Sequence, residues 1–192
     1  MKIIGITGGI GSGKTTVSNL LRKSGYIVFD CDLEARNIYD TDIEVISKMK
    51  EMFGDNIYKD GVLDRKLIAK IVFSDKSSLD KLNALIHPKT REIMFKRISE
   101  TANELFFVES AILFEFKLNE CMDKVICITA PDDIRIKRVM KRDNITKEQV
   151  IARMKHQMNN DNRLKKSDYI INTDQDILSV KNDVFKIINE LK

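Results

Sequence analysis

Cysteine and proline are scarce in this sequence, and it contains no long apolar run. Its 192 residues include three cysteines, Cys31, Cys121 and Cys127, an odd number with no CxxC pair. This argues against a disulfide framework and a zinc site, and it is typical of a protein of the reducing cytoplasm. With only two prolines, no flexible linker separates independent domains. No stretch reaches the roughly 18 apolar residues that a membrane span needs, so we expect a soluble cytoplasmic protein.

Neither sign of charge dominates. The sequence has 33 Lys and Arg against 29 Asp and Glu, a net charge of +4, which is too small to indicate a nucleic-acid or membrane surface by itself. Aromatic residues make up 7% and do not alternate with basic positions as a base-stacking surface requires. An apolar content of 43% is ordinary for a globular protein and excludes disorder. We therefore expect no nucleic-acid partner and no membrane partner.

Short apolar runs alternate with helical patterns along the chain. The runs cover residues 2–7, 26–30, 105–109, 124–129 and 168–172. They are apolar at successive positions, as in parallel strands that are buried on both faces. The sequence therefore predicts an α/β fold, a mostly parallel sheet flanked by helices.

Helices are predicted at 15–24, over Asp64–Thr101 with breaks near Ser74 and at Pro88, and at 177–191, where apolar residues recur every three or four positions. The interval between the second and third strands is far longer than one crossover needs. We interpret about 41–103 as an inserted helical subdomain within a single domain of residues 1–192, whose core comprises 1–40, 104–133 and 165–192.

The strongest motif is GGIGSGKT at Gly8–Thr15, which matches the phosphate-loop pattern G-x-x-x-x-G-K-[ST]. Glycines allow backbone N–H groups to curl around phosphate oxygens, and the dipole of the following helix favours the same anion. Lys14 would reach the β- and γ-phosphates, and the Thr15 hydroxyl would bind Mg²⁺. A glycine-rich turn with an accidental lysine is the alternative, but a strand before the motif and a helix after it favour nucleotide binding. The predicted nucleotide contacts in this segment are Gly11, Ser12, Gly13, Lys14, Thr15 and Thr16.

Other motifs narrow the class of phosphate-loop protein. The D-x-x-G and N-K-x-D motifs of GTPases are absent, and the third strand ends in a single carboxylate at Glu109, not in Asp-Glu. A small-molecule kinase fits the length best. Such a kinase needs a base for the acceptor hydroxyl, and the second strand ends in two candidates, Asp30 and Asp32. Either aspartate could instead cap a helix or a turn.

Arginines follow the fourth strand. Arg135, Arg138 and Arg142 share one helical face, and Arg153 and Gln157 form an i, i+4 pair further on. They could form an ordinary solvated basic face. Beside a phosphate loop we favour a lid at about 134–164, with Arg138 and Arg142 closing on the triphosphate. The spacing of His87 by itself does not indicate a function.

The motifs together resemble the dephospho-CoA kinase family over nearly the full length. They are TGGIGSGKTTV at 7–17, FDCDLEAR at 29–36, DGVLDRKLIAKIVFSD at 60–75, LNALIHP at 82–88, AILFE at 111–115, RVMKRDNITKEQVIARMKHQ at 138–157 and SDYIIN at 167–172. The phosphate loop is common to a large superfamily, whereas D-x-D-x-x-A-R together with I-H-P and R-x-x-x-R-D is far more specific. One departure is Glu109, because the family usually has Asp-Val-Pro-Leu-Leu at 109–113.

The resemblance implies transfer of the ATP γ-phosphate to the 3′-hydroxyl of the dephospho-CoA ribose with Mg²⁺, the last step of coenzyme A synthesis. It implies that Asp32 is the base, with Lys14 and Arg138 also catalytic and Arg142 in the lid. It also implies that Arg36, His87 and Arg91 face the acceptor and that the insert binds it. We expect ATP and dephospho-CoA as partners and a monomer or small homo-oligomer.

Two other functions remain open from the residues. A nucleoside or nucleotide kinase would use the same phosphate transfer with another acceptor, although the long insert suits a long acceptor better than a small base pocket. A nucleotide-dependent binding module, for instance for nucleic acid, would use the basic lid without transferring phosphate.

Overall fold

Five parallel strands form the centre of the first of two compact units, which comprises Met1–Asp30 and Ala102–Lys192. The structure, a computed structural model, describes the backbone of residues 1–192 and every side chain except that of Phe73. The sheet order is β2-β5-β1-β6-β7, and each neighbouring pair is parallel. The strands are β1 (Lys2–Thr7), β2 (Ile27–Asp30), β5 (Leu105–Glu109), β6 (Lys124–Thr129) and β7 (Tyr169–Asn172). The predicted α/β class and all five predicted strands are confirmed.

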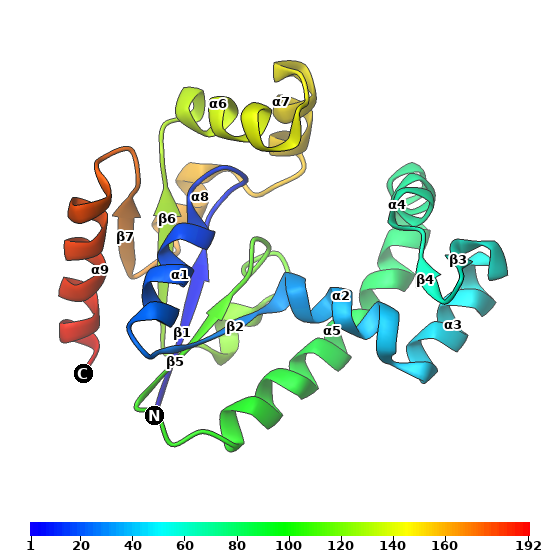
Figure 1. The fold of residues 1–192 in the computed structure, drawn as a ribbon, viewed down its shortest axis with the longest axis horizontal. Coiled ribbons are helices and arrows are strands. Elements are labelled where there is room, and N and C mark those ends of the chain that lie inside the picture. Colours follow the sequence, from blue (N-terminus) through cyan, green and yellow to red (C-terminus); the bar gives the residue numbers. More distant parts are fainter. The chain divides into compact units, whose positions relative to one another are not determined.

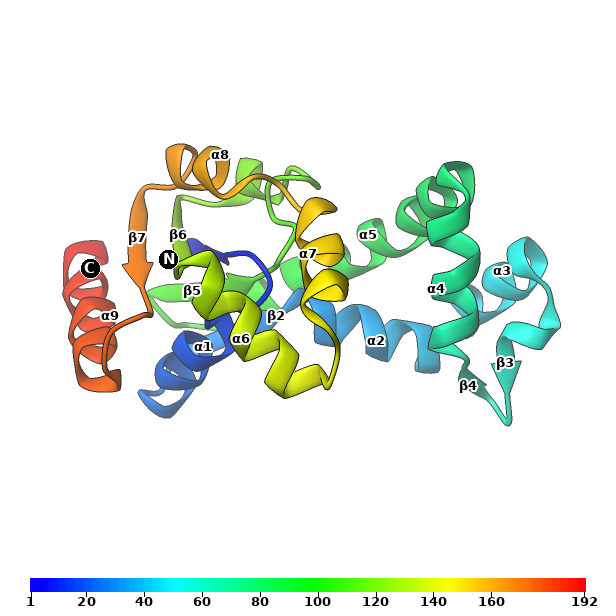
Figure 2. The same ribbon diagram turned by 90° about the horizontal axis from the view of Figure 1, so that it is seen from above.

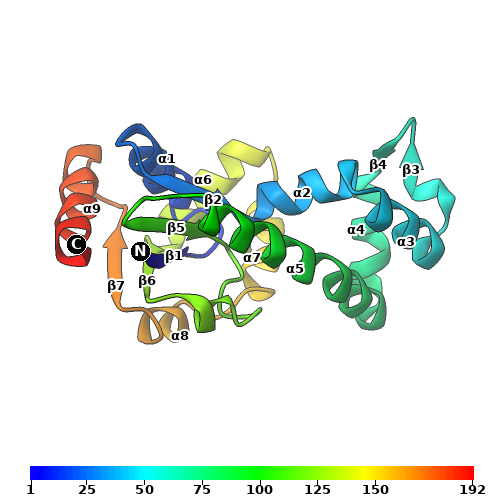
Figure 3. The same cartoon turned by 90° about the horizontal axis from the view of Figure 1, so that it is seen from below.

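Helices cover both faces of this sheet, which explains why its strands are apolar at successive positions. The helices α1 (Lys14–Lys23) and α9 (Ile177–Leu191) lie on one face, and α8 (Asn160–Lys165) lies on the other (Figures 2 and 3). On the first face, Ile4 and Ile6 of β1 pack with Leu21 of α1 and Val184 of α9 in a core whose members are nearly inaccessible to solvent. This core holds the carboxyl end of β1, and the phosphate loop that follows it, in place.

Three helices connect β6 to β7 in the region predicted to be a lid. They are α6 (Asp132–Asp143), α7 (Lys147–Lys155) and α8. A capping box starts α7, because the Thr146 side chain accepts from the Gln149 N–H while the Gln149 side chain accepts from the Thr146 N–H. Between β5 and β6 lies the short 3₁₀ helix η2 (Leu118–Cys121).

The second compact unit comprises Cys31–Thr101. Its elements are α2 (Cys31–Thr41), α3 (Ile43–Phe53), the 3₁₀ helix η1 (Asp55–Ile57), the hairpin β3 (Tyr58–Lys59) and β4 (Val62–Leu63), α4 (Arg65–Ser74) and α5 (Lys76–Ser99) (Figure 1). The unit has its own core, which includes Ile38, Val45 and Ile86. It therefore starts ten residues before the insert that we expected from residue 41, since α2 contributes Ile38 to this core.

Helix α5 corrects one prediction. The expected break near Ser74 is present, because Asp75 caps α5 by accepting from the N–H groups of Ser77 and Ser78. The break expected at Pro88 is wrong, since α5 continues through it to Ser99. Proline removes one helical hydrogen bond, but α5 is held by tertiary packing on both sides of it, through the buried Leu82 and Ile86 before Pro88 and Met94 and Ile98 after it. Among the described helices, none combines the length and the apolar content needed to cross a membrane.

Candidate active site

The segment Gly8–Gly13 joins β1 to α1 and has the conformation expected of a phosphate loop. Gly11 and Gly13 have φ angles of +77° and +94°, which side chains rarely adopt. A Cβ on Gly11 would lie 2.6 Å from the carbonyl oxygen of Arg135, so the loop also needs glycine there for space. Gly13 precedes α1 without a side chain to cap it, and no acidic residue lies in the first turn. The positive end of α1 therefore suits an anion.

The side chains of the loop have the exposure expected of a nucleotide site. The Lys14 Nζ donates to the Gly8 carbonyl at 2.7 Å, so the ammonium bridges the two ends of the loop. Thr15 and Thr16 are exposed on the first turn of α1, whereas Ser12 is buried. The Ser12 hydroxyl has no hydrogen-bond partner among the described residues. The Thr15 hydroxyl is thus accessible to an ion or a phosphate.

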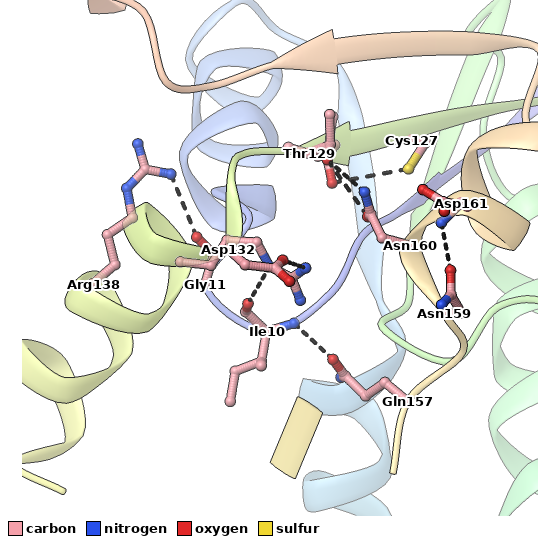
Figure 4. A network of polar contacts seen from close by, with 12 residues as sticks. Ile10, Gly11, Cys127, Thr129, Asp132, Arg138, Gln157, Asn159, Asn160 and Asp161 are labelled. Carbon is pink, nitrogen blue, oxygen red and sulfur yellow. Dashed lines mark hydrogen bonds and ion pairs between the residues drawn. The ribbon is translucent and has the colours of Figure 1, made fainter. Parts of the chain in front are cut away.

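Two side chains of the lid region, Arg135 on α6 and Gln157 after α7, bind the phosphate loop at Ile10 (Figure 4). The Ile10 N–H donates to the Oε1 of Gln157 at 2.8 Å, and the Ile10 carbonyl accepts from the Nε of Arg135 at 3.0 Å. Arg135 is 4% exposed and also donates to Asp132 at 2.8 Å. Both polar groups of the Ile10 peptide are therefore satisfied by side chains more than 120 residues away in the sequence.

Arg138 contacts the loop as well. Its NH1 lies 3.4 Å from the Gly11 carbonyl (Figure 4). The same nitrogen donates to the Thr173 hydroxyl at 2.9 Å, and NH2 donates to the Thr173 carbonyl at 2.6 Å. The structure thus places the predicted Arg138 at the rim of the phosphate loop.

Arg142 has different partners. Its guanidinium forms two hydrogen bonds with Asp143, at 2.7 and 3.1 Å, and its side chain is 62% exposed. Arg153 donates to the same carboxylate at 2.7 Å. These two arginines lower the pKa of Asp143. The structure therefore joins Arg142 to Arg153 through Asp143, and within the described part of the chain no hydrogen bond links Arg142 to the phosphate loop.

Two carboxylates lie where adjacent strands end. Asp30 of β2 and Glu109 of β5 are paired in register. Glu109 is 6% exposed, and its Oε2 has no hydrogen-bond partner among the described residues, although Arg22 lies 3.9 Å away. Burial raises the pKa of Glu109, the charge of Asp30 adds to this effect, and Lys14 and Arg22 oppose it. The Ser18 hydroxyl also lowers the pKa of this carboxyl, so the group is only partly compensated and its Oε2 is the atom without a hydrogen bond among the described residues.

The predicted acceptor residues all lie in the second unit. Asp32 and Arg36 are exposed one turn apart on α2, and His87 and Arg91 are one turn apart on α5, which packs against α2. Burial lowers the pKa of His87, so its imidazole is neutral at neutral pH. The Arg91 guanidinium lies 5.5 Å from the centre of the Phe95 ring. The structure thus groups the four residues on two neighbouring helices.

A groove of about 870 Å³ lies among α6, α7 and the carboxyl ends of β6 and β7. Its lining includes Arg135 and Gln157, which hold Ile10, and Asn160, which bonds to Thr129 (Figure 4). None of the predicted site residues is among its lining residues, although the groove adjoins the phosphate loop through Arg135 and Gln157.

Comparison with known proteins identifies the family. The sequence profile of the dephospho-CoA kinase family matches residues 2–179. A dephospho-CoA kinase of Listeria monocytogenes is 34% identical in an alignment 191 positions long, which covers 97% of this chain and 96% of that protein. One of Carboxydothermus hydrogenoformans is 32% identical and covers 100% of this chain and 95% of its own length. The chain belongs to the dephospho-CoA kinase family. The predicted family and the predicted reaction, ATP-dependent phosphorylation of dephospho-CoA to coenzyme A, are thereby confirmed.

Solved structures agree with this assignment. A dephospho-CoA kinase from Campylobacter jejuni has a TM-score of 0.72 and 30% identity, covering 98% of this chain and 96% of that one. A Thermus thermophilus protein has a TM-score of 0.91 and 33% identity, covering 100% of this chain and 98% of that one. A shikimate kinase from Bacteroides thetaiotaomicron, at 15% identity and a TM-score of 0.54, shares the fold.

Sequence reasoning did not predict that Thr173 and Arg135 contact the phosphate loop. The Thr173 hydroxyl reaches the Ser12 carbonyl across 161 sequence positions, and no motif marks such a contact. Arg135 shares a helical face with Arg138, so its spacing did suggest a role, but the spacing could not show that this arginine lies buried behind the loop.

Proposed function

We propose that this chain transfers the γ-phosphoryl group of ATP to the 3′-hydroxyl of the ribose of dephospho-CoA, with the loop Gly8–Gly13 holding the triphosphate. One observation carries the nucleotide part of this proposal. The glycine-rich loop has its φ > 0 glycines at Gly11 and Gly13, directly before an uncapped helix N-terminus, and Lys14 bridges its two ends. Such an arrangement binds phosphate by backbone N–H groups, a helix dipole and one mobile charge.

Asp32 is proposed as the base that accepts the proton of the attacking hydroxyl. It is exposed in the first turn of α2, two positions after the last residue of β2. Lys14 and Arg138 would neutralise charge on the group in transfer, as positive groups do in phosphoryl transfer. Arg142 would join them after exchanging Asp143 for a phosphate, which a guanidinium binds with the same two-pronged geometry.

Mg²⁺ is proposed as the metal that accompanies ATP. Among the described residues, no three His, Cys, Asp or Glu side chains are grouped as metal ligands, so the protein would hold the ion together with phosphate oxygens and water, as is usual for Mg²⁺. The exposed Thr15 hydroxyl is an oxygen ligand of the right kind. The buried Glu109 carboxylate, whose Oε2 lacks a hydrogen bond among described residues, fits a water of the ion's hydration shell. The ion would neutralise charge on the phosphates.

The acceptor is proposed to bind through α2 and α5. Dephospho-CoA carries a diphosphate, and Arg36 and Arg91 are exposed cations that suit it. His87 would act as a hydrogen-bonding group and not as a charge, because burial lowers its pKa. The absence of a membrane-spanning pattern and of paired cysteines in the sequence supports a cytoplasmic site for the reaction.

The test is a coupled assay of ADP release with purified protein. Turnover is expected to require dephospho-CoA and to fall about a hundredfold or more in Asp32→Asn, which removes the base. Asp55→Asn is the matched control, since Asp55 lies in the same unit with its side chain 89% exposed, and it should retain full activity. An Asp32→Asn enzyme with undiminished turnover would refute the assignment of the base. Faster phosphorylation of adenosine, shikimate or a nucleoside monophosphate would refute the acceptor.

A further inference from the structure

Thr173 lies directly after β7 and is 5% exposed. Its N–H donates to the Thr129 carbonyl at 2.9 Å, so its backbone continues the pairing of β7 with β6 by one residue. A side chain at this position is therefore held by the sheet itself, and its direction is set by a rigid element of the fold.

The hydroxyl of Thr173 joins two parts of the nucleotide site. It donates to the Ser12 carbonyl at 2.7 Å, with the Thr129 carbonyl further away at 3.3 Å, and it accepts from the NH1 of Arg138 at 2.9 Å. A hydroxyl has one proton to donate and lone pairs to accept, so the contacts to Ser12 and Arg138 are compatible with each other. One oxygen atom thus binds both the phosphate loop and an arginine of the lid region.

The remainder of the side chain packs against the same loop. A Cβ built on Gly13 would lie 3.0 Å from the Thr173 Oγ1 and 3.2 Å from its Cγ2. The loop therefore lies directly against Thr173 where it turns into α1, and a displacement of either segment would disturb the other.

We infer that Thr173 is a positioning residue for phosphoryl transfer, whose hydroxyl orients Arg138 and the Ser12 peptide of the phosphate loop. The inference rests on the proposed role of Arg138 in neutralising charge. Without the hydroxyl, Arg138 would keep its bond to the Thr173 carbonyl at 2.6 Å and the long contact of its NH1 to the Gly11 carbonyl at 3.4 Å. It would lose its 2.9 Å bond from NH1, so the position of that end of the guanidinium would be less well defined. Misplacement of a charge-neutralising group lowers the rate of reaction more than it weakens ground-state binding.

The experiment compares Thr173→Val, which keeps the shape and removes the hydroxyl, with Thr173→Ser, which keeps the hydroxyl. Thr173→Val is expected to lower kcat about tenfold or more, with a smaller change in KM for ATP and none in KM for dephospho-CoA. Thr173→Ser should stay within about twofold of the original enzyme. Equal losses in both variants would show that the methyl group and its packing matter, and would overturn the inference.

A double-mutant cycle with Arg138→Met tests the route through the arginine. Adding Thr173→Val to Arg138→Met should cause little further loss, whereas independent, multiplying losses would overturn the inference. Full activity of Arg138→Met alone would also overturn it and leave the proposed reaction standing, since Asp32→Asn tests that reaction separately. Urea unfolding of each variant shows that it is folded, and Thr173→Ala, which cannot overpack the site, replaces Thr173→Val if that variant does not fold.

Discussion

The carboxylate of Glu109 is buried at the end of β5 and poorly compensated. Its Oε2 lacks a hydrogen bond among the described residues, and burial raises its pKa above the ordinary value of 4.5. A carboxyl group whose pKa is raised by folding stabilises the fold only while it is protonated, so this contribution is lost as the pH rises through the folded-state pKa. Glu109 therefore lowers the stability of the fold at pH values where its carboxyl is ionised.

Replacing Glu109 by Gln should stabilise the protein in a pH-dependent way. The variant is expected to match the original near pH 4, where the carboxyl is protonated in both states, and to unfold at a higher temperature above about pH 7, where the buried charge is removed. Thermal unfolding across this range measures the difference. Glu120→Gln, at an exposed position, is the control and should show no such trend. A Glu109→Gln difference that stays constant with pH would contradict this account of the raised pKa.

Because of Pro88, α5 depends on tertiary packing more than on the helix propensity of its own sequence. The ring removes one backbone donor from a helix of 24 residues, yet α5 stays continuous because buried side chains hold it on both sides of the proline. Tertiary packing here overcomes a local preference, which is why the predicted break does not occur.

Pro88→Ala should therefore stabilise the chain. Alanine restores the missing N–H and is better suited to a helix interior than proline by up to about 3 kcal/mol. The free energy of unfolding, measured in urea, should increase by part of this amount. Lys81→Ala, on the exposed side of the same helix, should change it far less. A loss of stability in Pro88→Ala would mean that contacts of the proline ring outweigh the cost to the helix.

Binding of ATP should make the folded chain as a whole more stable, since the ligand requires a formed phosphate loop. Mg–ATP at about a hundred times its Kd should add about 2.7 kcal/mol to the free energy of unfolding. Lys14→Ala is expected to lose most of this gain, because Lys14 supplies the mobile positive charge at the loop. Lys23→Ala, in the exposed last turn of the same helix, should keep it. Thermal unfolding with and without Mg–ATP measures both variants. Equal stabilisation of Lys14→Ala and the original protein would contradict the assigned role of the loop.

The sequence was most informative where chemistry and structure are local. The phosphate-loop motif is eight consecutive residues, Gly8–Thr15, whose glycines, lysine and threonine are the residue types that phosphate binding requires. Each strand was visible as a short apolar run because both faces of the sheet are covered. Asp32, Arg36 and His87 could be named because the resemblance to the family carries them in short motifs, whereas Arg91 follows such a motif and was only implied by the resemblance. The roles of all four stay predictions.

Arg142 shows where local pattern is insufficient. Its spacing from Arg138 places both on one helical face, yet in the structure Arg138 binds Thr173 and Arg142 binds its neighbour Asp143. Which hydrogen-bond acceptor each arginine binds depends on the positions of the surrounding segments in three dimensions. The spacing of residues along one helix does not determine those positions.

The sequence by itself determined the fold class, the family and the segment that binds phosphate, because these depend on side-chain periodicity and on consecutive residues. Tertiary structure alone decided that α5 runs through Pro88, that the Ile10 peptide is held by Arg135 and Gln157, and that Thr173 joins Ser12 to Arg138. Each of these features depends on contacts between residues that are far apart in the sequence. Such contacts stabilise the fold only after the intervening chain has been brought together, so no local pattern can reveal them.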